Sequence, residues 1–164
     1  MHTVPLSSPA AGEILEWTAS APQKRGVPEH LPGPMPLPST QTVLAAFRAA
    51  GCHGSAWFEV TDAETVPLLA ECPDPGVCSR TGGLDLGEVS LTAIGYGSPD
   101  QPLSTDAAIE GTSFRKPATK AVLAAMCALA PSAGPQLVFD DSAGTVFVVR
   151  PGERVEDLAA EWPW

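Results

Sequence analysis

The chain has 164 residues, of which 44% are hydrophobic and 17% charged, so it is apolar enough to fold as one domain around its own core. Its formal net charge is −10, and it therefore lacks the excess of basic side chains with which proteins bind nucleic acid or anionic membranes. No apolar run approaches the ~18 residues of a membrane span, and the first residues do not resemble a secretory signal. We therefore expect a cytoplasmic protein with reduced cysteines, and neither nucleic acid nor a membrane as its partner.

Residues 1–38 are rich in proline and are predicted to form an extended segment that packs on a domain spanning residues 39–164. Within this segment the apolar residues of GEILEWTAS (12–20) predict a short strand. Every second residue from Pro32 to Pro38 is proline, which removes each N–H donor along one edge of an extended chain. Such a segment suits a blocked sheet edge or a strap lying on the domain.

The remaining residues alternate between apolar patterns with the period of a helix and patterns with the period of a strand. Ser39 or Thr40 can cap the first helix, Pro117 fits the first turn of a later one, and Pro131 is expected to end it. Residues 141–144 form the turn of a predicted β-hairpin. Helices are expected at 40–50, 61–72 (short or broken), 117–130 and 153–162, and strands at 55–61, 87–95, 109–115, 137–139 and 146–149. These elements predict an α+β fold, a single layered domain with a mostly antiparallel sheet of about five strands and three to four helices packed on it.

Four soft side chains, Cys52, His53, Cys72 and Cys78, are the candidate ligands of a zinc site. Five residues separate Cys72 from Cys78, whereas ligands in zinc knuckles are two to four residues apart. Cys52 and His53 are adjacent, so their side chains point apart if the chain is extended there. A redox pair of Cys72 and Cys78 is the alternative, but neighbouring acidic residues disfavour a reactive thiolate. The spacing therefore predicts no metal and no cofactor.

Catalytic motifs such as G-x-S-x-G, Walker A, G-x-G-x-x-G and H-E-x-x-H do not occur in the chain. His2 lies at a terminus, where chains are usually loose. Asp140 and Asp141 lie at the predicted hairpin turn, where aspartate favours local hydrogen bonds rather than acid–base chemistry. These observations favour a protein that is not an enzyme.

Charged residues form two candidate binding surfaces. Basic residues at the start of the helix predicted at 117–130 can hold an anion or an acidic loop of the protein itself. Acidic residues on the last predicted helix, with the tryptophan that follows it, can dock a basic partner. The predicted anion-binding residues are Arg115, Lys116 and Lys120, and the predicted partner-binding residues are Glu153, Glu156, Asp157, Glu161 and Trp164.

The acidity, the small size and the missing catalytic motif predict a protein that binds a basic protein partner, as an immunity or accessory protein does. The alternative is a small enzyme that uses cysteine and histidine, or a protein that binds a metal or an anionic ligand. A composition rich in alanine, proline and acidic residues is common in proteins of high-GC bacteria.

Overall fold

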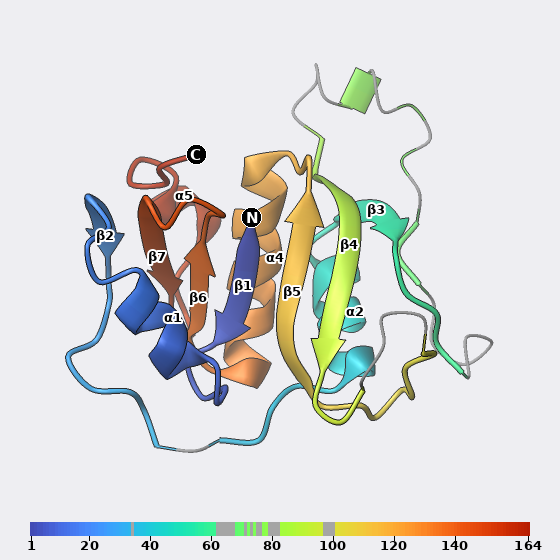
Figure 1. The fold of residues 1–164 in the computed structure, drawn as a ribbon. Helices are drawn as coiled ribbons and strands as arrows, with labels where there is room; N and C mark the ends of the chain where they lie inside the picture. Colours follow the sequence, from blue (N-terminus) through green and yellow to red (C-terminus); the bar gives the residue numbers. More distant parts are fainter. Residues whose placement is uncertain are drawn as a thin grey trace.

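The computed structural model describes residues 1–33, 35–61, 68–70, 72, 74, 77–78, 83–96 and 101–164. It shows an α+β fold in which a single mixed sheet of seven strands carries helices on both faces (Figure 1). Within the described residues, no helix is long and apolar enough to cross a membrane. The elements are β1 His2–Pro5, α1 Ala11–Trp17, β2 Gln23–Arg25, α2 Thr40–Ala49, β3 His53–Ala56, β4 Asp85–Ala93, β5 Ile109–Arg115, α4 Thr119–Ala133, β6 Gln136–Phe139, β7 Thr145–Val149 and α5 Val155–Leu158.

The strand order is β2-β7-β6-β1-β5-β4-β3. The two outermost pairs, β2 with β7 and β3 with β4, are parallel, and the four pairs between them are antiparallel. The predicted sheet of about five mostly antiparallel strands is thus corrected to a mixed sheet of seven. Two of the strands, β1 and β2, come from the region predicted as an extended proline-rich segment, and they are too short to show an alternating pattern.

The N-terminal region is the largest departure from the prediction. β1 lies inside the sheet, where it pairs with both β5 and β6, so His2 does not lie on a loose terminus. The strand predicted at 12–20 falls largely in α1, because Ala11, Ile14 and Leu15 have helical spacing and together face an apolar cluster. Residues 26–33 and 35–38 form neither helix nor strand, and in Figure 1 this connection runs along the lower edge of the molecule to α2.

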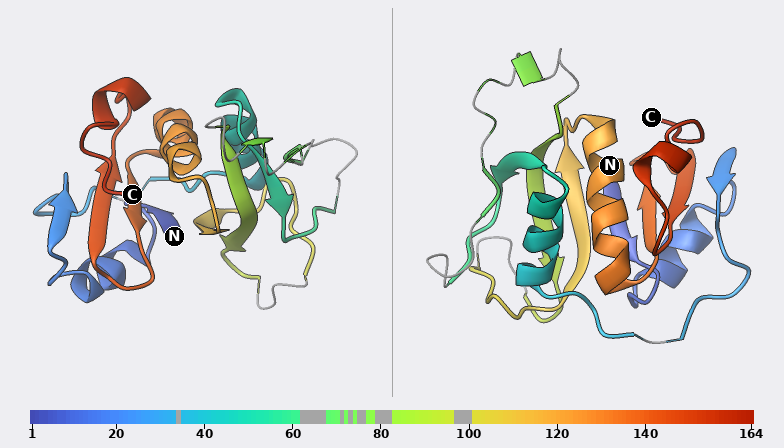
Figure 2. Two further views of the ribbon diagram at one scale, coloured as in Figure 1. Left: turned by 90° about the horizontal axis from the view of Figure 1, so that it is seen from above. Right: turned by 180° about the vertical axis from the view of Figure 1, so that it is seen from behind.

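Helices α2, α4 and α5 cover one face of the sheet, and α1 covers part of the other (Figures 1 and 2). The main core lies under α2 and α4, with Leu44, Phe47 and Met126 fully buried. Ser39 caps α2 as predicted, since its hydroxyl accepts a hydrogen bond from the Thr42 N–H at 3.1 Å. On the opposite face α1 packs on the cluster that includes β6 and β7, so polar side chains of β4 and β5 remain accessible.

Several predicted elements have different ends. α4 continues through Pro131, because a proline this close to the end of a helix removes little of the hydrogen-bond ladder. α5 has only four residues rather than the ten predicted at 153–162. The strand predicted at 55–61 begins earlier, as β3, and the helix predicted at 61–72 falls mostly outside the described residues. Strand β5 has the predicted bounds, 109–115.

The β6–β7 hairpin confirms the prediction of a local turn. One carboxylate oxygen of Asp140 accepts hydrogen bonds from the Ser142 N–H (3.0 Å), the Ser142 hydroxyl (2.7 Å) and the Gly144 N–H (3.0 Å). Asp141, in contrast, points away from the turn and bonds to His2 of β1. The two neighbouring aspartates therefore have different roles, and only the first follows the turn prediction.

Candidate metal centre

Two residues of the candidate site are the first residues of two neighbouring strands at one edge of the sheet. His53 is the first residue of β3 and Asp85 the first residue of β4, and these strands run parallel with His53 opposite Asp85. Adjacent strands lie about 4.8 Å apart. The register therefore brings an imidazole and a carboxylate within reach of one ion.

Residues 57–84 connect the two strands, and backbone hydrogen bonds hold two described residues of this connection, Ala70 and Leu84, against β3. The His53 N–H donates to the Leu84 carbonyl at 3.0 Å, and the Gly54 N–H donates to the Ala70 carbonyl at 2.9 Å. Residues 70 and 84 are therefore fixed beside the start of β3. This arrangement brings the cysteines of the connection to the strand edge.

The local backbone around Cys78 directs its thiol to His53. The Cys78 N–H donates to the Asp74 carbonyl at 2.8 Å, and the Gly83 N–H donates to the Cys78 carbonyl at 2.9 Å. A Cβ atom on Gly83 would lie 2.1 Å from the Cys78 Sγ, closer than atoms can pack. Only glycine at position 83 leaves the thiol in this place.

One ligand atom from each of His53, Cys72, Cys78 and Asp85 lies within 4.8 Å of every other. His53 Nε2 and Cys78 Sγ are 2.9 Å apart. Around a tetrahedral zinc ion, bonds of about 2.1–2.3 Å place the ligand atoms roughly 3.3–3.8 Å apart. Small side-chain movements would therefore convert this cluster into a four-coordinate site.

The electrostatics of the cluster also favour a cation. Removal from water raises the pKa of Cys78 to about 11, and the hydrogen bond with Cys72, its charge and the carboxylate of Asp85 add to this effect. Two thiolates and a carboxylate in one place repel each other unless a positive charge lies between them. A divalent ion supplies that charge and favours the deprotonated thiol.

The structure unites three of the four ligands named from the sequence and excludes the fourth. Cys52 is buried in the core, where its thiol donates to the Ala121 carbonyl at 3.5 Å and burial raises its pKa to about 12. All four cysteines are thiols in the structure, with no disulfide among them. Asp85 was missed, because only the pairing of β3 with β4 places it beside His53.

A hollow of about 280 Å³ opens beside the cluster. It reaches two of the four ligand residues, Cys72 and Asp85, and it also reaches two of the predicted anion-binding residues, Arg115 and Lys116. Its lining is Gly54, Ser55, Cys72, Asp85, Gly87, Glu88, Arg115 and Lys116. The cluster is thus close to the surface, and an ion can reach it.

The predicted basic cluster is only partly assembled. Arg115 forms an ion pair with Glu88 of the neighbouring strand at 3.0 Å, and Lys116 lies beside it with a positive φ of 54°. Lys120 is exposed on α4. It lines neither this hollow nor a second hollow, of about 350 Å³, that Arg115 and Lys116 also line. Anion binding by these residues stays a prediction.

Most of the predicted partner-binding carboxylates have partners inside the chain. Arg25 binds Glu153 at 2.8 Å and Glu161 at 3.1 Å, and Arg154 binds Asp157 at 2.9 Å. Of the remaining two residues, Glu156 is exposed, whereas Trp164 packs edge-on against Trp162 with ring centroids 4.7 Å apart. Binding of a basic protein through this surface also stays a prediction.

No family model, curated protein or solved structure matches the chain. The function must therefore be argued from the arrangement of its side chains.

Proposed function

We propose that this protein binds one zinc ion through His53, Cys72, Cys78 and Asp85. The observation that carries the proposal is the convergence of four ligand atoms, each within 4.8 Å of the others, from two strands and the connection between them. The ligands are separated in sequence by the crossover itself, so no compact sequence motif marks the site. This explains why the spacing of the cysteines argues against a zinc knuckle.

The ligand types select the metal. Calcium and magnesium bind oxygen atoms, and two thiolates exclude them as natural occupants. Iron–sulfur clusters are held mainly by cysteine, and this cluster has only two. Two sulfurs, one imidazole nitrogen and one carboxylate oxygen suit a borderline-soft ion that accepts tetrahedral geometry, which is zinc.

The number of ligands indicates a structural role. Zinc in structural sites has four protein ligands, whereas catalytic zinc keeps a position for water or substrate. Here the ion would join β4 and the connection to β3, which is the edge strand of the sheet that the described residues form. We infer that zinc fastens this edge of the sheet and the connection to the rest of the domain.

The test is metal analysis of the purified protein. We expect about one equivalent of zinc per chain, and cobalt substitution should give the strong visible absorption of tetrahedral Co²⁺ together with a thiolate charge-transfer band. Cys72→Ser and Cys78→Ser should each lose most of the metal, because each removes a sulfur ligand. Cys127→Ser is the matched control, since Cys127 lies on α4 and outside the cluster.

Two results would overturn the proposal. The first is wild-type protein that takes up no zinc or cobalt even when loaded at micromolar free metal. The second is equal zinc content in Cys78→Ser, Cys127→Ser and the wild type.

A further inference from the structure

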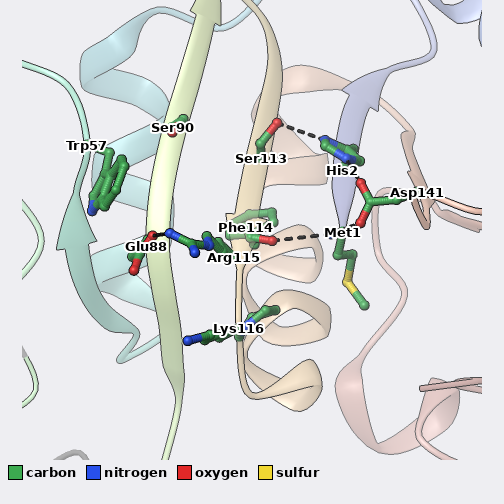
Figure 3. A pocket seen from close by; sticks show the side chains of 11 residues that line it. Met1, His2, Trp57, Glu88, Ser90, Ser113, Phe114, Arg115, Lys116 and Asp141 are labelled. Atoms are coloured by element: carbon green, nitrogen blue, oxygen red, sulfur yellow. Dashed lines mark hydrogen bonds and ion pairs between the residues drawn. The ribbon is translucent and has the colours of Figure 1, made fainter.

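A second site lies on the face of the sheet opposite α2 and α4 (Figure 3). It is a hollow of about 350 Å³ over β1, β5 and β4. Exposed Trp57 borders it on one side and Asp141 on the other. Its lining is Met1, His2, Trp57, Glu88, Ser90, Ser113, Phe114, Arg115, Lys116, Pro117 and Asp141.

Three of these side chains form a hydrogen-bonded chain. His2 Nδ1 lies 2.8 Å from the Ser113 hydroxyl oxygen, and His2 Nε2 bonds to a carboxylate oxygen of Asp141. The sheet creates the alignment, because His2 pairs with Ser113 on one side and with Phe139 on the other, and Asp141 follows Phe139 by two residues. The imidazole also stacks on the Phe139 ring, with centroids 5.4 Å apart, which fixes its plane.

The hydrogen bonds define which nitrogen carries the proton. The hydrogen bond from His2 is the main cause that lowers the pKa of Asp141, so this carboxyl is ionised at neutral pH and can only accept. In neutral imidazole Nε2 therefore donates to Asp141, and the lone pair of Nδ1 faces the Ser113 hydroxyl. A hydroxyl that donates to a base held by a carboxylate is the arrangement of an activated nucleophile.

We propose that Ser113 is a nucleophile, activated by His2 as general base and positioned by Asp141, that attacks small activated carboxylic esters in this hollow. Ser113 Oγ bonds to the carbonyl carbon, its proton moves to His2 Nδ1, and the carbonyl π pair moves onto oxygen. When the carbonyl re-forms, the bond to the alcohol oxygen breaks and that oxygen takes the proton from His2. Water, deprotonated by the same nitrogen, then cleaves the acyl–Ser113 ester, and the net reaction is ester plus water to acid plus alcohol.

The stabilisation of the oxyanion sets the expected rate. Backbone N–H groups beside Ser113 are used in the sheet, as when the Phe114 N–H donates to the Met1 carbonyl at 2.8 Å. Arg115 lies two residues along β5 and lines the same hollow, but its guanidinium is bonded to Glu88, so it must leave Glu88 to stabilise the developing oxyanion. Because Arg115 is also paired with Glu88, we expect slow turnover and clear covalent labelling.

Covalent labelling of the intact protein tests the proposal. A fluorophosphonate should add once, with Ser113 Oγ bonding to phosphorus and fluoride leaving, and peptide mapping should place the adduct on Ser113. Earlier exposure to p-nitrophenyl acetate should slow this labelling. Ser113→Ala should remove the adduct, whereas Ser90→Ala should keep it, because Ser90 faces Ser113 across the strand pair and lines the same hollow without a bond to His2.

Variants of the other two residues separate chemistry from structure. His2→Gln should slow labelling about 100-fold, the scale of general-base catalysis. Asp141→Asn should also slow it, and Asp141→Glu should restore part of the rate, because the carboxylate rather than the turn is required. The Asp141 side chain is 78% exposed, so Asp141→Asn should keep the melting temperature of the wild type. If His2→Gln does not fold, the labelling rate of Asp141→Asn tests the proposal. An unlabelled wild type, equal labelling of Ser113→Ala, or unchanged rates in folded Asp141→Asn would overturn the proposal.

Discussion

Two pairs of neighbouring strands, β6 with β7 and β3 with β4, are held together in two different ways. β6 and β7 are joined by a short turn in which Asp140 accepts three hydrogen bonds from residues within four positions of it. β3 and β4 are parallel, so a long connection, residues 57–84, must cross between them. Closing a long connection costs more chain entropy than closing a turn. The cluster of four candidate metal ligands lies at this long connection, and the following predictions test whether an ion there offsets the cost.

Removing the metal should have the largest effect. Chelation of zinc, or Cys78→Ser, should lower the melting temperature by about 10 °C, since an ion at about 1,000 times its Kd stabilises a domain of this size by about 4 kcal/mol. Hydrogen exchange should become faster in β3 and at the start of β4 and should stay unchanged in β6 and β7. Equal acceleration in β6 and β7 would contradict the view that only the β3–β4 pair depends on the ion.

Acid should release the metal before it affects the hairpin. Removal from water, with Cys72 and Asp85 nearby, raises the pKa of Cys78 to about 11, so this thiol is protonated at neutral pH without metal, and zinc must displace the proton. Apparent affinity should therefore fall at least tenfold per pH unit as pH decreases below 7. Competition with a zinc-sensitive dye between pH 6 and 8 measures this slope, and a flat profile would contradict thiolate ligation.

Gly83→Ala should weaken the zinc site without removing a ligand. The added Cβ would lie 2.1 Å from the Cys78 Sγ and must displace it. We expect zinc affinity to fall about 10–100-fold, as when groups that orient metal ligands are changed. Gly33→Ala is the matched control, because no atom lies within 4 Å of its added Cβ and its φ is not positive.

The smallest effect is expected at the hairpin. Asp140→Ala removes three hydrogen bonds, and because the residue is only partly buried, we expect a loss of about 1 kcal/mol in the free energy of unfolding, with zinc content unchanged. Burial alone would raise the pKa of Asp140, but hydrogen bonds from Ser142 and Gly144 outweigh it and lower the pKa. The stabilisation is therefore present above the ordinary pKa of 3.8 and is lost as pH falls below it. Urea titrations should show a smaller difference from the wild type at pH 2 than at pH 7, and Ser142→Ala should cost less.

Elements with a sustained local pattern could be predicted from the sequence. Strand β5, Ile109 to Arg115, has the predicted bounds, and it contains the β-branched and aromatic residues that are typical of strands. The apolar run of α4 and the turn at Asp140 were recognisable for the same reason, because neighbouring residues carry the signal. β1 was not, since four residues ending in Pro5 show no period, and only pairing with β5 and β6 makes them a strand.

The candidate site was partly predictable. Cys72, Cys78 and His53 were possible ligands because thiols and imidazole bind zinc. Their spacing argued against a site, because zinc knuckles, whose ligands lie two to four residues apart, place them on one compact loop. No local sequence pattern marked Asp85 as a ligand, because only the register of the parallel β3–β4 pair places it opposite His53. His2 looked like a terminal residue, and Asp141 like a turn residue, until β1 was placed between β5 and β6.

By itself the sequence determined the α+β class, the net negative charge, the hairpin and the two longest helices, because these depend on composition and on interactions between residues a few positions apart. Only the tertiary structure decided which thiols share a site with an imidazole and that Ser113, His2 and Asp141 form one chain of hydrogen bonds. Both arrangements depend on strand order and register, and these are set by packing between distant segments that no local pattern records.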